Sequence, residues 1–336
     1  MTEPAYSSTK RQRKIRLSPS RILFGALTLF TLAVILRNAE VAIRQMNYGL
    51  RLCVTSVIPS LFPFMVLSEL LLCVGAIRPI GKLLSRPFRF LFDIGEESVC
   101  ALLLGWLCGF PVGPRCALSL YRQGHIDHVE LSRLLCFSNL PSSAFLISTV
   151  GISLFGDRSF GIYLYGITLC SAILLGILGN LLHRKQKKTQ SASASFFRPS
   201  TDPIPSLSGI RAFSEAVGSS ALALLRICAF IVFFSVFVGS LEYLISGLSL
   251  SPTASALLFG IFEMTGGTAR AAALSNPYIG EIVCMLLVGW SGISVHCQLI
   301  SLCSDASIPL RPYLLAKVAH GILNVLLWIA VRSVLL

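Results

Sequence analysis

The chain has 336 residues, of which 54% are hydrophobic and only 13% are charged, and its formal net charge is +13. A soluble domain normally carries about a quarter charged residues, so the composition excludes an ordinary soluble protein. The basic residues gather beside apolar segments, which argues against a nucleic-acid partner and favours contact with anionic lipid. Several apolar runs approach the length of a transmembrane helix. We therefore predict an all-α polytopic membrane protein.

The amino-terminal part combines a basic tail with the first helices. Residues 1–20 are polar and basic and are predicted to form a disordered, cytoplasmic tail. Residues 21–37 are predicted to be a first apolar helix that is retained, because no small-residue cleavage signal follows it. Residues 38–57 are amphipathic, and the stretch PSLFPF introduces a second apolar helix ending near Gly75. The first membrane repeat is expected to cover residues 21–182.

A basic amphipathic stretch interrupts this repeat. Residues 78–97 place four basic side chains among Ile, Leu and Phe, a pattern typical of a helix that lies flat on the membrane surface. A broken apolar segment, 99–122, follows. Asp127 is expected to cap the next helix, with Glu130 three positions later as in a capping box. The apolar run 160–182 closes the repeat.

The segment 183–215 begins with a run of basic residues and continues with Ser, Ala, Pro and Thr. Such a composition is typical of a linker, and its basic residues place it on the cytoplasmic side. A second membrane repeat, 216–336, is expected to follow. Its predicted helical segments are 216–245, 253–274 (broken at FEMTGGTAR), 279–303 (broken at GWSGISVHCQ) and 309–336.

The two halves share a pattern of helix breakers. Gly105-x9-Arg115 (GWLCGFPVGPR) matches Gly260-x9-Arg270 (GIFEMTGGTAR), and each is followed by a second break, NLPSS in one half and SGISVH in the other. The separation is about 150 residues in both comparisons. We interpret the pattern as an internal repeat, either inverted or parallel. Chance or simple composition is the alternative explanation.

The paired breaks predict a substrate site. Backbone groups freed from a helix inside a bilayer are costly unless they are buried in protein or line a wet cavity. Interruptions at corresponding points of two halves are typical of a transporter's binding site, where half-helix amino termini suit anions. The alternative is that Gly and Pro only permit close helix packing. The second breaks supply neutral polar side chains: Asn139, Ser142, Ser143, Ser291, Ser294 and Gln298.

Ionisable residues at membrane depth are usually functional. Arg115 and Arg270 hold matching positions, and two guanidinium groups facing one cavity would suit a small dianion; either could instead snorkel to an interface. Glu263, just before the break at Thr265, could pair with Arg270, bind a cation, carry a coupling proton or form a structural hydrogen bond at a helix end. His296 could titrate near neutrality or be simply hydrogen-bonded.

No enzymatic chemistry is predicted. Ser294 and His296 are two residues apart, which points them to different faces of a helix, and the chain contains no GxSxG, HExxH or paired transmembrane aspartate motif. The few histidines are scattered without ligand spacing, so no metal site or other cofactor is expected. The coupling ion, proton or sodium, is left open.

The combined order of the motifs resembles the YlbJ-type sporulation integral membrane proteins of the nucleoside-recognition, or Gate-domain, group. The resemblance covers residues 38–336 and depends on GWLCGFPVGPR, LSRLLCFSNLPSSAFLISTVG, FEMTGG and GWSGISVHCQL followed by RPYLLAKVAHG. A small polar and glycine stretch is expected after Asn139, where this chain has Leu140-Pro141-Ser142-Ser143. In chain order, the family's recognition motifs fall on Gly109, Pro111 and Gly113, on Asn139, on Glu263 and Gly267, and on Ser294, His296 and Gln298.

The resemblance implies a fold similar to concentrative nucleoside transporters, with two repeats, re-entrant hairpins and interrupted helices. It also implies movement of dipicolinic acid, a planar aromatic dicarboxylate, from the mother cell towards the forespore, and a place in the outer forespore membrane. We therefore expect alternating-access transport of a small organic anion. The alternatives are a nucleoside or nucleobase carrier and a non-transporting membrane scaffold or gate in sporulation. A homo-oligomer is left open.

Overall fold

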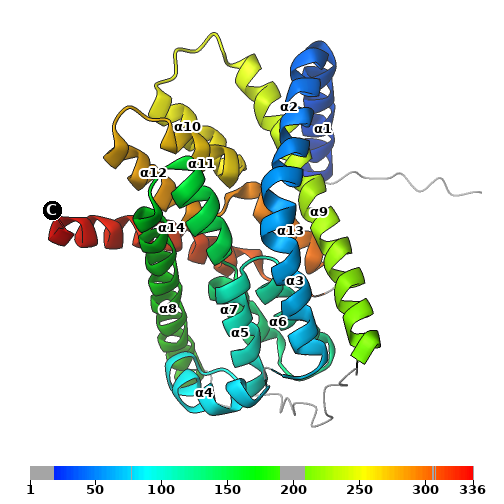
Figure 1. Ribbon diagram of the computed structural model, residues 1–336, viewed down its shortest axis with the longest axis vertical. Helices are drawn as coiled ribbons and strands as arrows, with labels where there is room; N and C mark the ends of the chain where they lie inside the picture. Colours follow the sequence, from blue (N-terminus) through cyan, green and yellow to red (C-terminus); the bar gives the residue numbers. More distant parts are fainter. Residues whose placement is uncertain (1–18, 77, 190–208, 305, 307, 336) are drawn as a thin grey trace, which may run out of the picture.

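The computed structural model describes residues 19–76, 78–189, 209–304, 306 and 308–335. Within this part of the chain all regular structure is helical (Figure 1), which confirms the predicted all-α class. The predicted tail, 1–20, lies outside the described residues except for the start of the first helix. The helices are α1 (Pro19–Arg37), α2 (Ala39–Leu52), the π-helix η1 (Cys53–Val57), α3 (Ile58–Cys73), α4 (Arg78–Phe92), α5 (Glu96–Cys108), α6 (Val112–Arg122), α7 (His128–Ser138), the π-helix η2 (Phe145–Leu154), α8 (Arg158–Thr189), α9 (Gly209–Leu244), α10 (Pro252–Phe262), α11 (Met264–Ala272), α12 (Pro277–Trp290), α13 (Gly292–Leu302) and α14 (Leu310–Leu335).

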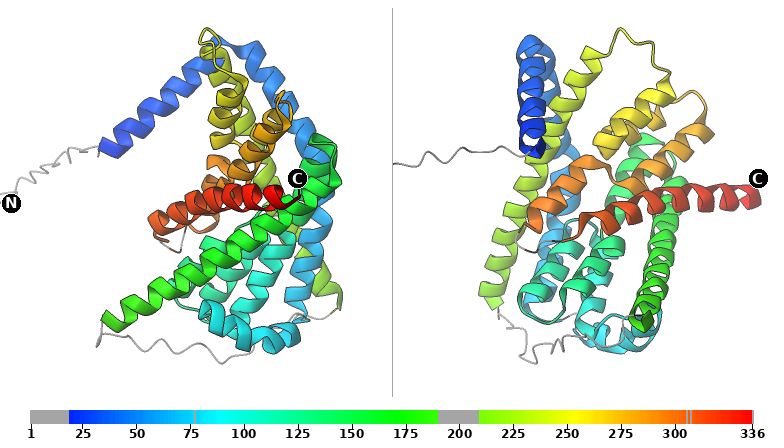
Figure 2. Two further views of the ribbon diagram at one scale, coloured as in Figure 1. Left: turned by 90° about the vertical axis from the view of Figure 1, so that its left-hand side faces the viewer. Right: turned by 180° about the vertical axis from the view of Figure 1, so that it is seen from behind.

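Several helical segments are long and apolar enough to cross a bilayer. By length and composition they are Arg158–Arg184, Gly209–Leu244, Pro277–Leu302 and Leu310–Val334. A fifth candidate is the pair Ile22–Arg37 and Ala39–Thr55, which is bent by 99°. The helix α1 angles away from the other helices (Figure 2), and its apolar side chains are largely exposed, as expected for a surface that faces lipid.

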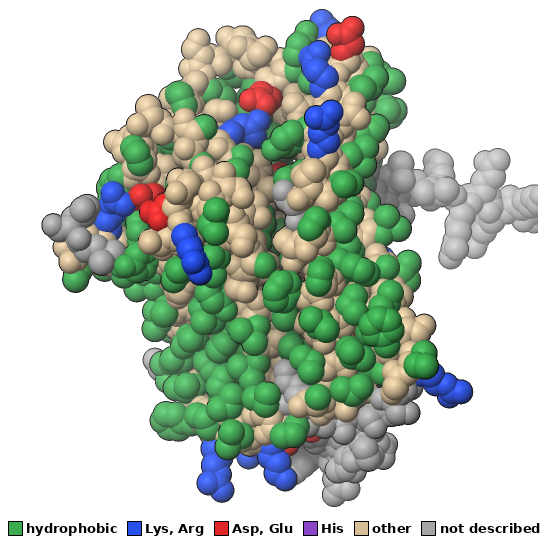
Figure 3. All heavy atoms as spheres, in the orientation of Figure 1, with side chains coloured by type: hydrophobic (Ala, Val, Ile, Leu, Met, Phe, Trp, Pro, Cys, Tyr) green, Lys and Arg blue, Asp and Glu red, His purple; other side chains and the backbone are tan. Residues whose placement is uncertain are grey.

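The helix α4 corresponds to the predicted surface stretch and lies at one end of the molecule (Figure 1). Its buried side packs on α5 and α8, and the ring of Phe92 stacks on Phe137 of α7 with centroids 5.4 Å apart. Leu83 and Phe90 on α4 are exposed, and Lys and Arg side chains project at this end of the molecule (Figure 3). The helix ends at Phe92, and α5 begins at Glu96, so the predicted range 78–97 covers α4 and the first residues of α5.

The first predicted break separates α5 from α6. Gly109 has a φ of +73°, in the left-handed region that glycine tolerates, and a cis Phe110–Pro111 bond follows it. Gly105 and Gly113 then bring the two half-helices into backbone contact, since a Cβ on Gly113 would lie 2.6 Å from the Cα of Gly105. The two short helices therefore form a tight hairpin.

An equivalent hairpin joins α10 and α11 in the second half. The break lies at Glu263, whose backbone is extended. Gly260 and Gly267 pack together as Gly105 and Gly113 do, and a Cβ on Gly267 would lie 2.3 Å from the Cα of Gly260. The glycines at 113 and 267, assigned to substrate binding from sequence, therefore hold the hairpins closed by close packing.

The second break of each half interrupts a longer apolar segment. Residues 139–142 are not helical and separate α7 from the segment that continues into η2. In the second half Ser291 and Gly292, with φ of 73° and 83°, separate α12 from α13. A long helix follows each break, α8 in one half and α14 in the other, and the two cross and pack together (Figure 1).

Two local features differ from the predictions. Both ends of the predicted linker 183–215 are helical, because α8 continues to Thr189 and α9 begins at Gly209; residues 190–208 lie outside the described part. Asp127 caps α7 as predicted, since its Oδ1 accepts a hydrogen bond of 2.7 Å from Glu130 N. The Glu130 carboxylate does not complete a capping box. It accepts from Gly95 N at 2.8 Å and Ser98 Oγ at 2.5 Å, where α5 starts without a side-chain cap of its own.

Candidate substrate site

The helix breaks of both halves border one interior cavity, which we call the central cavity. It contains about 680 Å³ of space not filled by atoms, part of it open to the surroundings. Phe110 contributes from the first break, and aliphatic side chains of α3 and α9 complete the apolar wall. The polar lining consists of Ser60, Asn139, Ser142, Glu263, Thr265, Ser291, Ser294 and Gln298.

Seven of the residues predicted from sequence thus line the same space. They are Asn139, Ser142, Glu263, Thr265, Ser291, Ser294 and Gln298. They come from three separate breaks or the helices that start there, the fourth break contributing Phe110, and tertiary packing alone brings them together. The predicted requirement that the interruptions surround a common cavity is therefore met by the geometry.

Two amide side chains give the cavity unpaired acceptors. Asn139 Nδ2 donates a hydrogen bond of 2.7 Å to Tyr313 OH, and Gln298 Nε2 donates one of 3.3 Å to Ser294 Oγ. The side-chain oxygens of both amides are buried and have no hydrogen-bond partner within the described residues. A buried unpaired acceptor costs about 1–3 kcal/mol, so a guest or water that donates hydrogen bonds here is favoured.

Glu263 acts as a helix cap. Its carboxylate accepts hydrogen bonds of 2.9 Å from Thr265 N and 2.5 Å from Gly266 N at the start of α11. Of the roles considered from sequence, the geometry matches the structural hydrogen bond at a helix end, and Arg270 pairs with another acid. The positive amino terminus of α11 is consequently occupied by a negative charge of its own chain.

The other half-helix starts differ in how they are capped. Ser142 Oγ accepts a hydrogen bond of 3.1 Å from Phe145 N at the start of η2. Within the described residues, α6, preceded by Pro111, and α13, preceded by Ser291, have no side-chain cap. Of these two, α13 keeps backbone N–H groups that suit an anion, whereas at α6 the N–H groups of Val112 and Gly113 already donate to Gly109 O, and that of Arg115 donates to Pro111 O. The amino termini of α11 and η2 are engaged by side chains.

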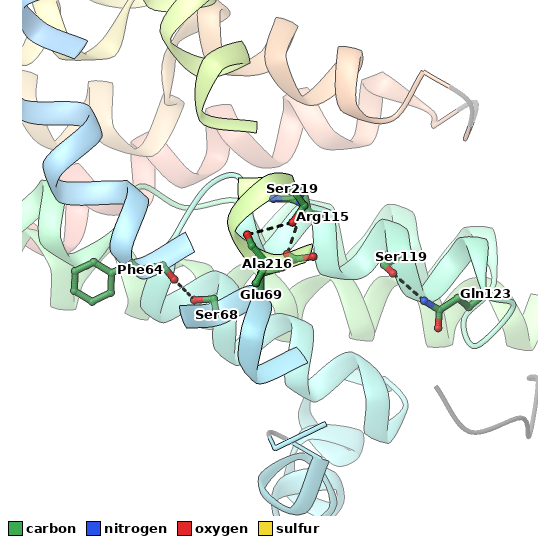
Figure 4. A network of polar contacts seen from close by, with 8 residues as sticks. All are labelled: Phe64, Ser68, Glu69, Arg115, Ser119, Gln123, Ala216 and Ser219. Carbon is green, nitrogen blue, oxygen red and sulfur yellow. Dashed lines mark hydrogen bonds and ion pairs between the residues drawn. The ribbon is translucent and has the colours of Figure 1, made fainter. Parts of the chain in front are cut away.

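The two predicted arginines do not face the central cavity. Arg115 lines a second cavity with Arg122 and Arg226, which we call the arginine vestibule, and its Nη2 lies 3.5 Å from Oε2 of Glu69. Figure 4 shows Arg115 between Glu69 and the turn of α9 that carries Ala216 and Ser219.

Arg270 lines a third cavity, together with Gln45 and Tyr48, which we call the Arg270 cavity. Its Nη2 lies 2.6 Å from Oε2 of Glu242. The expectation that both guanidinium groups face one cavity is therefore wrong. Each arginine lies outside the central cavity and contacts an acid on a neighbouring helix. Sequence spacing does not reveal these partners.

Four further predicted residues lie outside the central lining. Gly109 is needed for its positive φ and for close approach to Ser142, since a Cβ there would lie 2.3 Å from Ser142 N. Pro111 lines the arginine vestibule. Ser143 Oγ donates a hydrogen bond of 3.0 Å to Leu107 O, which ties the two first-half breaks together. His296 is buried and hydrogen-bonded, with Nδ1 2.9 Å from Tyr313 OH.

A polar row on α14 was not assigned to the site from sequence. Tyr313, Lys317, His320 and Asn324 are all buried, with Lys317 at 0% exposure. Lys317 Nζ donates a hydrogen bond of 2.9 Å to Asn139 O at the end of α7, and His320 Nε2 lies 3.0 Å from Thr168 O on α8. The signal was available in the sequence, because spacings of four, three and four residues place these side chains on one face of a helix.

Comparison with known proteins agrees with the order of the motifs. The chain is 27% identical over 326 residues to the sporulation integral membrane protein YlbJ of Bacillus subtilis (strain 168), a match that covers 90% of this chain and 80% of that protein. Neither a family model nor a solved structure matches the chain. The similarity extends over nearly all of the helical core described above. It confirms the predicted family: the chain is a relative of the YlbJ-type sporulation integral membrane proteins.

Proposed function

We propose that this protein is a membrane transporter that moves a small organic anion by alternating access through a site formed by broken helices. The observation that carries the proposal is the adjacency of three cavities. The arginine vestibule and the central cavity share Phe110, Ile227 and Gln298 as walls, and the central cavity and the Arg270 cavity share Glu263. A row of cavities centred on helix breaks is the arrangement expected of a transporter's binding site.

The paired construction of the two halves supports this mechanism. Each half contains a glycine-packed hairpin, then an interrupted apolar segment, then a long helix. We take these as two structural repeats with re-entrant hairpins, similar to concentrative nucleoside transporters. In such proteins one unit moves against another around the site and exposes it to each side in turn.

Dipicolinic acid is the proposed substrate. The relative is named for sporulation, and the family resemblance implies this dicarboxylate. Three arginines line the arginine vestibule, and positively charged cavities concentrate anions. The basic residues of α4 and of the last turns of α8 favour the cytoplasmic side for that end of the molecule, which would be the mother-cell side of an outer forespore membrane.

Reconstitution tests the proposal directly. The full chain in proteoliposomes that enclose terbium ions, whose luminescence dipicolinate sensitises, should take up external dipicolinate faster than protein-free vesicles. Asn139→Ala removes a lining amide and should reduce the rate at least tenfold. Ser159→Ala, at an exposed position outside the central lining, is the control. No flux with folded wild-type protein would contradict transport and favour the scaffold role, for which Asn139→Ala should be tolerated.

One observation favours a second candidate, a nucleoside or nucleobase carrier. The polar groups of the central cavity are amides, hydroxyls and a single carboxylate, and its lining contains no arginine among the described residues. Such a set suits a neutral guest that donates hydrogen bonds. In the same vesicles, radiolabelled uridine uptake that dipicolinate does not inhibit would select this candidate. Dipicolinate uptake that excess uridine leaves unchanged would exclude it.

A further inference from the structure

The arginine vestibule lies between α6, α9 and α13 and contains about 800 Å³ of unfilled space, part of it open. Of its three arginines, only Arg115 was expected at a site from the sequence; Arg226 lies on α9. We infer that this vestibule is a binding site in its own right for a small dianion such as a dicarboxylate, and that Arg226 is its principal ligand.

The position of Arg226 along α9 is unusual for a charge. The next charged residue towards the carboxyl end is Glu242, and the fifteen residues between them are uncharged, a rise of about 22 Å along a helix. Ten uncharged residues precede Arg226 as well. A charge between two apolar stretches of a membrane helix is expensive unless it faces a polar cavity or a partner, and such a position indicates a function.

Arg226 is also unpaired. Its side chain is exposed and makes no hydrogen bond or ion pair with the described part of the chain. It shares one face of α9 with Ser219, Ala223 and Phe230, since these positions follow at spacings of four, three and four, and all four line the vestibule. The guanidinium group therefore faces this cavity with its donors available.

The opposite wall supplies the second guanidinium group. Arg115 and Arg122 are seven residues apart on α6, hence on one face, and both line the vestibule. Glu69, which is not among the residues that line the vestibule, lies 3.5 Å from one nitrogen of Arg115. Guanidinium groups from two helices match the two carboxylates of a dianion, each of which accepts a pair of parallel hydrogen bonds. The rings of Phe110 and Phe230 offer apolar surface between them.

A role of this site in transport rests on the proposed function, whereas binding of a dianion in the vestibule does not. The vestibule shares Phe110, Ile227 and Gln298 with the central cavity. A dianion held by Arg226 and Arg115 would be concentrated next to this wall before it enters the central cavity. The vestibule would thereby select substrates by charge.

Calorimetric titration of the purified full chain tests the inference. The probes are dipicolinate as the dianion and pyridine-2-carboxylate as the monoanion. Arg226→Gln should weaken dipicolinate binding by about 10-fold or more, as expected for loss of a charge-assisted pair, and should abolish the preference for the dianion. Arg226→Lys keeps the charge but loses the planar fork and should be intermediate. Arg211→Gln, exposed on the same helix and outside the vestibule lining, is the matched control and should bind like the wild type.

The outcomes separate this inference from the proposed function. Dianion binding that Arg226→Gln weakens and Asn139→Ala leaves intact supports a vestibule site distinct from the central cavity. If such binding is found without flux in proteoliposomes, transport fails and the vestibule site stands. Wild-type binding by Arg226→Gln, or no dianion binding by the wild type, overturns the inference, whatever the flux.

Discussion

The helix breaks of the two halves border the same cavity but are stabilised in different ways. In the second half the stabilising groups are local, since Glu263 caps α11 and Ser291 Oγ donates to Val288 O. In the first half they come from elsewhere in the chain. Phe110 N donates to Leu140 O at 2.6 Å, and Lys317 Nζ on α14 donates to Asn139 O. The first-half breaks therefore receive support from α14 through Lys317, in addition to a contact between breaks of the kind also present in the second half, where Trp290 Nε1 donates to Ile261 O at 3.0 Å.

This difference extends to the electrostatics of the site. The amino terminus of α11 is closed by the carboxylate of Glu263, whereas α6, preceded by Pro111, starts without a side-chain cap beside the arginine vestibule. Under the proposed function, an anion would thus meet arginine side chains on the first-half side and a carboxylate on the other. If the proposed function holds, the arginine vestibule makes the first-half side the one that attracts the substrate anion.

The largest expected effect comes from the glycines of the breaks. A Cβ at Gly109 would lie 2.3 Å from Ser142 N at a φ of +73°, whereas the nearest atom to a Cβ at Gly292 is at 3.0 Å, with a φ of +83°. Gly109→Ala should cost more than about 3 kcal/mol, because overpacking adds to left-handed strain. Gly292→Ala should cost about 1–2 kcal/mol from strain. Thermal unfolding of both variants in one detergent measures the difference.

A matched control is Gly218→Ala on α9, where a Cβ would meet nothing within 4 Å; it should be neutral or slightly stabilising, since Ala favours helices. Equal losses for Gly109→Ala and Gly292→Ala would remove the proposed asymmetry between the halves.

Loss of Lys317 should have a smaller but still clear effect. Lys317→Met preserves most of the side-chain volume but leaves the carbonyl of Asn139 without its ammonium donor, which should cost about 1–3 kcal/mol. Because that carbonyl ends α7 beside the central cavity, dipicolinate flux should fall as well. Thermal unfolding and vesicle uptake measure the two effects. Arg311→Met, at an exposed position near the start of α14, controls for removal of a basic residue. If the unfolding midpoint of Lys317→Met equals that of the wild type, α14 does not support the end of α7 as proposed.

The smallest expected change in stability is that of Glu263→Gln. The amide keeps one acceptor for the start of α11 but loses the charge, so stability should fall by about 1 kcal/mol or less. Removal of a negative group from the central cavity should at the same time strengthen dipicolinate binding severalfold, as calorimetry can show. Glu40→Gln, in the exposed first turn of α2, should leave binding unchanged. Weaker dipicolinate binding by Glu263→Gln would instead mean that the carboxylate helps to hold the substrate.

Much of the helical framework could be predicted because its signals are local. Long apolar runs, the Asp127 cap and the glycines and prolines of the breaks act within a few residues of themselves. The lining of the central cavity could be predicted in part, since a polar side chain at a helix break inside a membrane has few other uses. The partners of Arg115, Arg270 and Glu130 could not be predicted from the sequence, because each partner depends on which helix lies alongside.

The sequence by itself determined that this protein is an all-helical membrane protein with interrupted apolar segments, since hydrophobic length and backbone breakers impose those features on any fold of the chain. Only the tertiary structure decided that the breaks surround one cavity, that the two arginines line separate spaces, and that α14 supplies Lys317 to the end of α7. Ion pairs and buried hydrogen bonds form between groups far apart in the chain. Their geometry follows from how the helices pack, a property that spacing along the sequence does not contain.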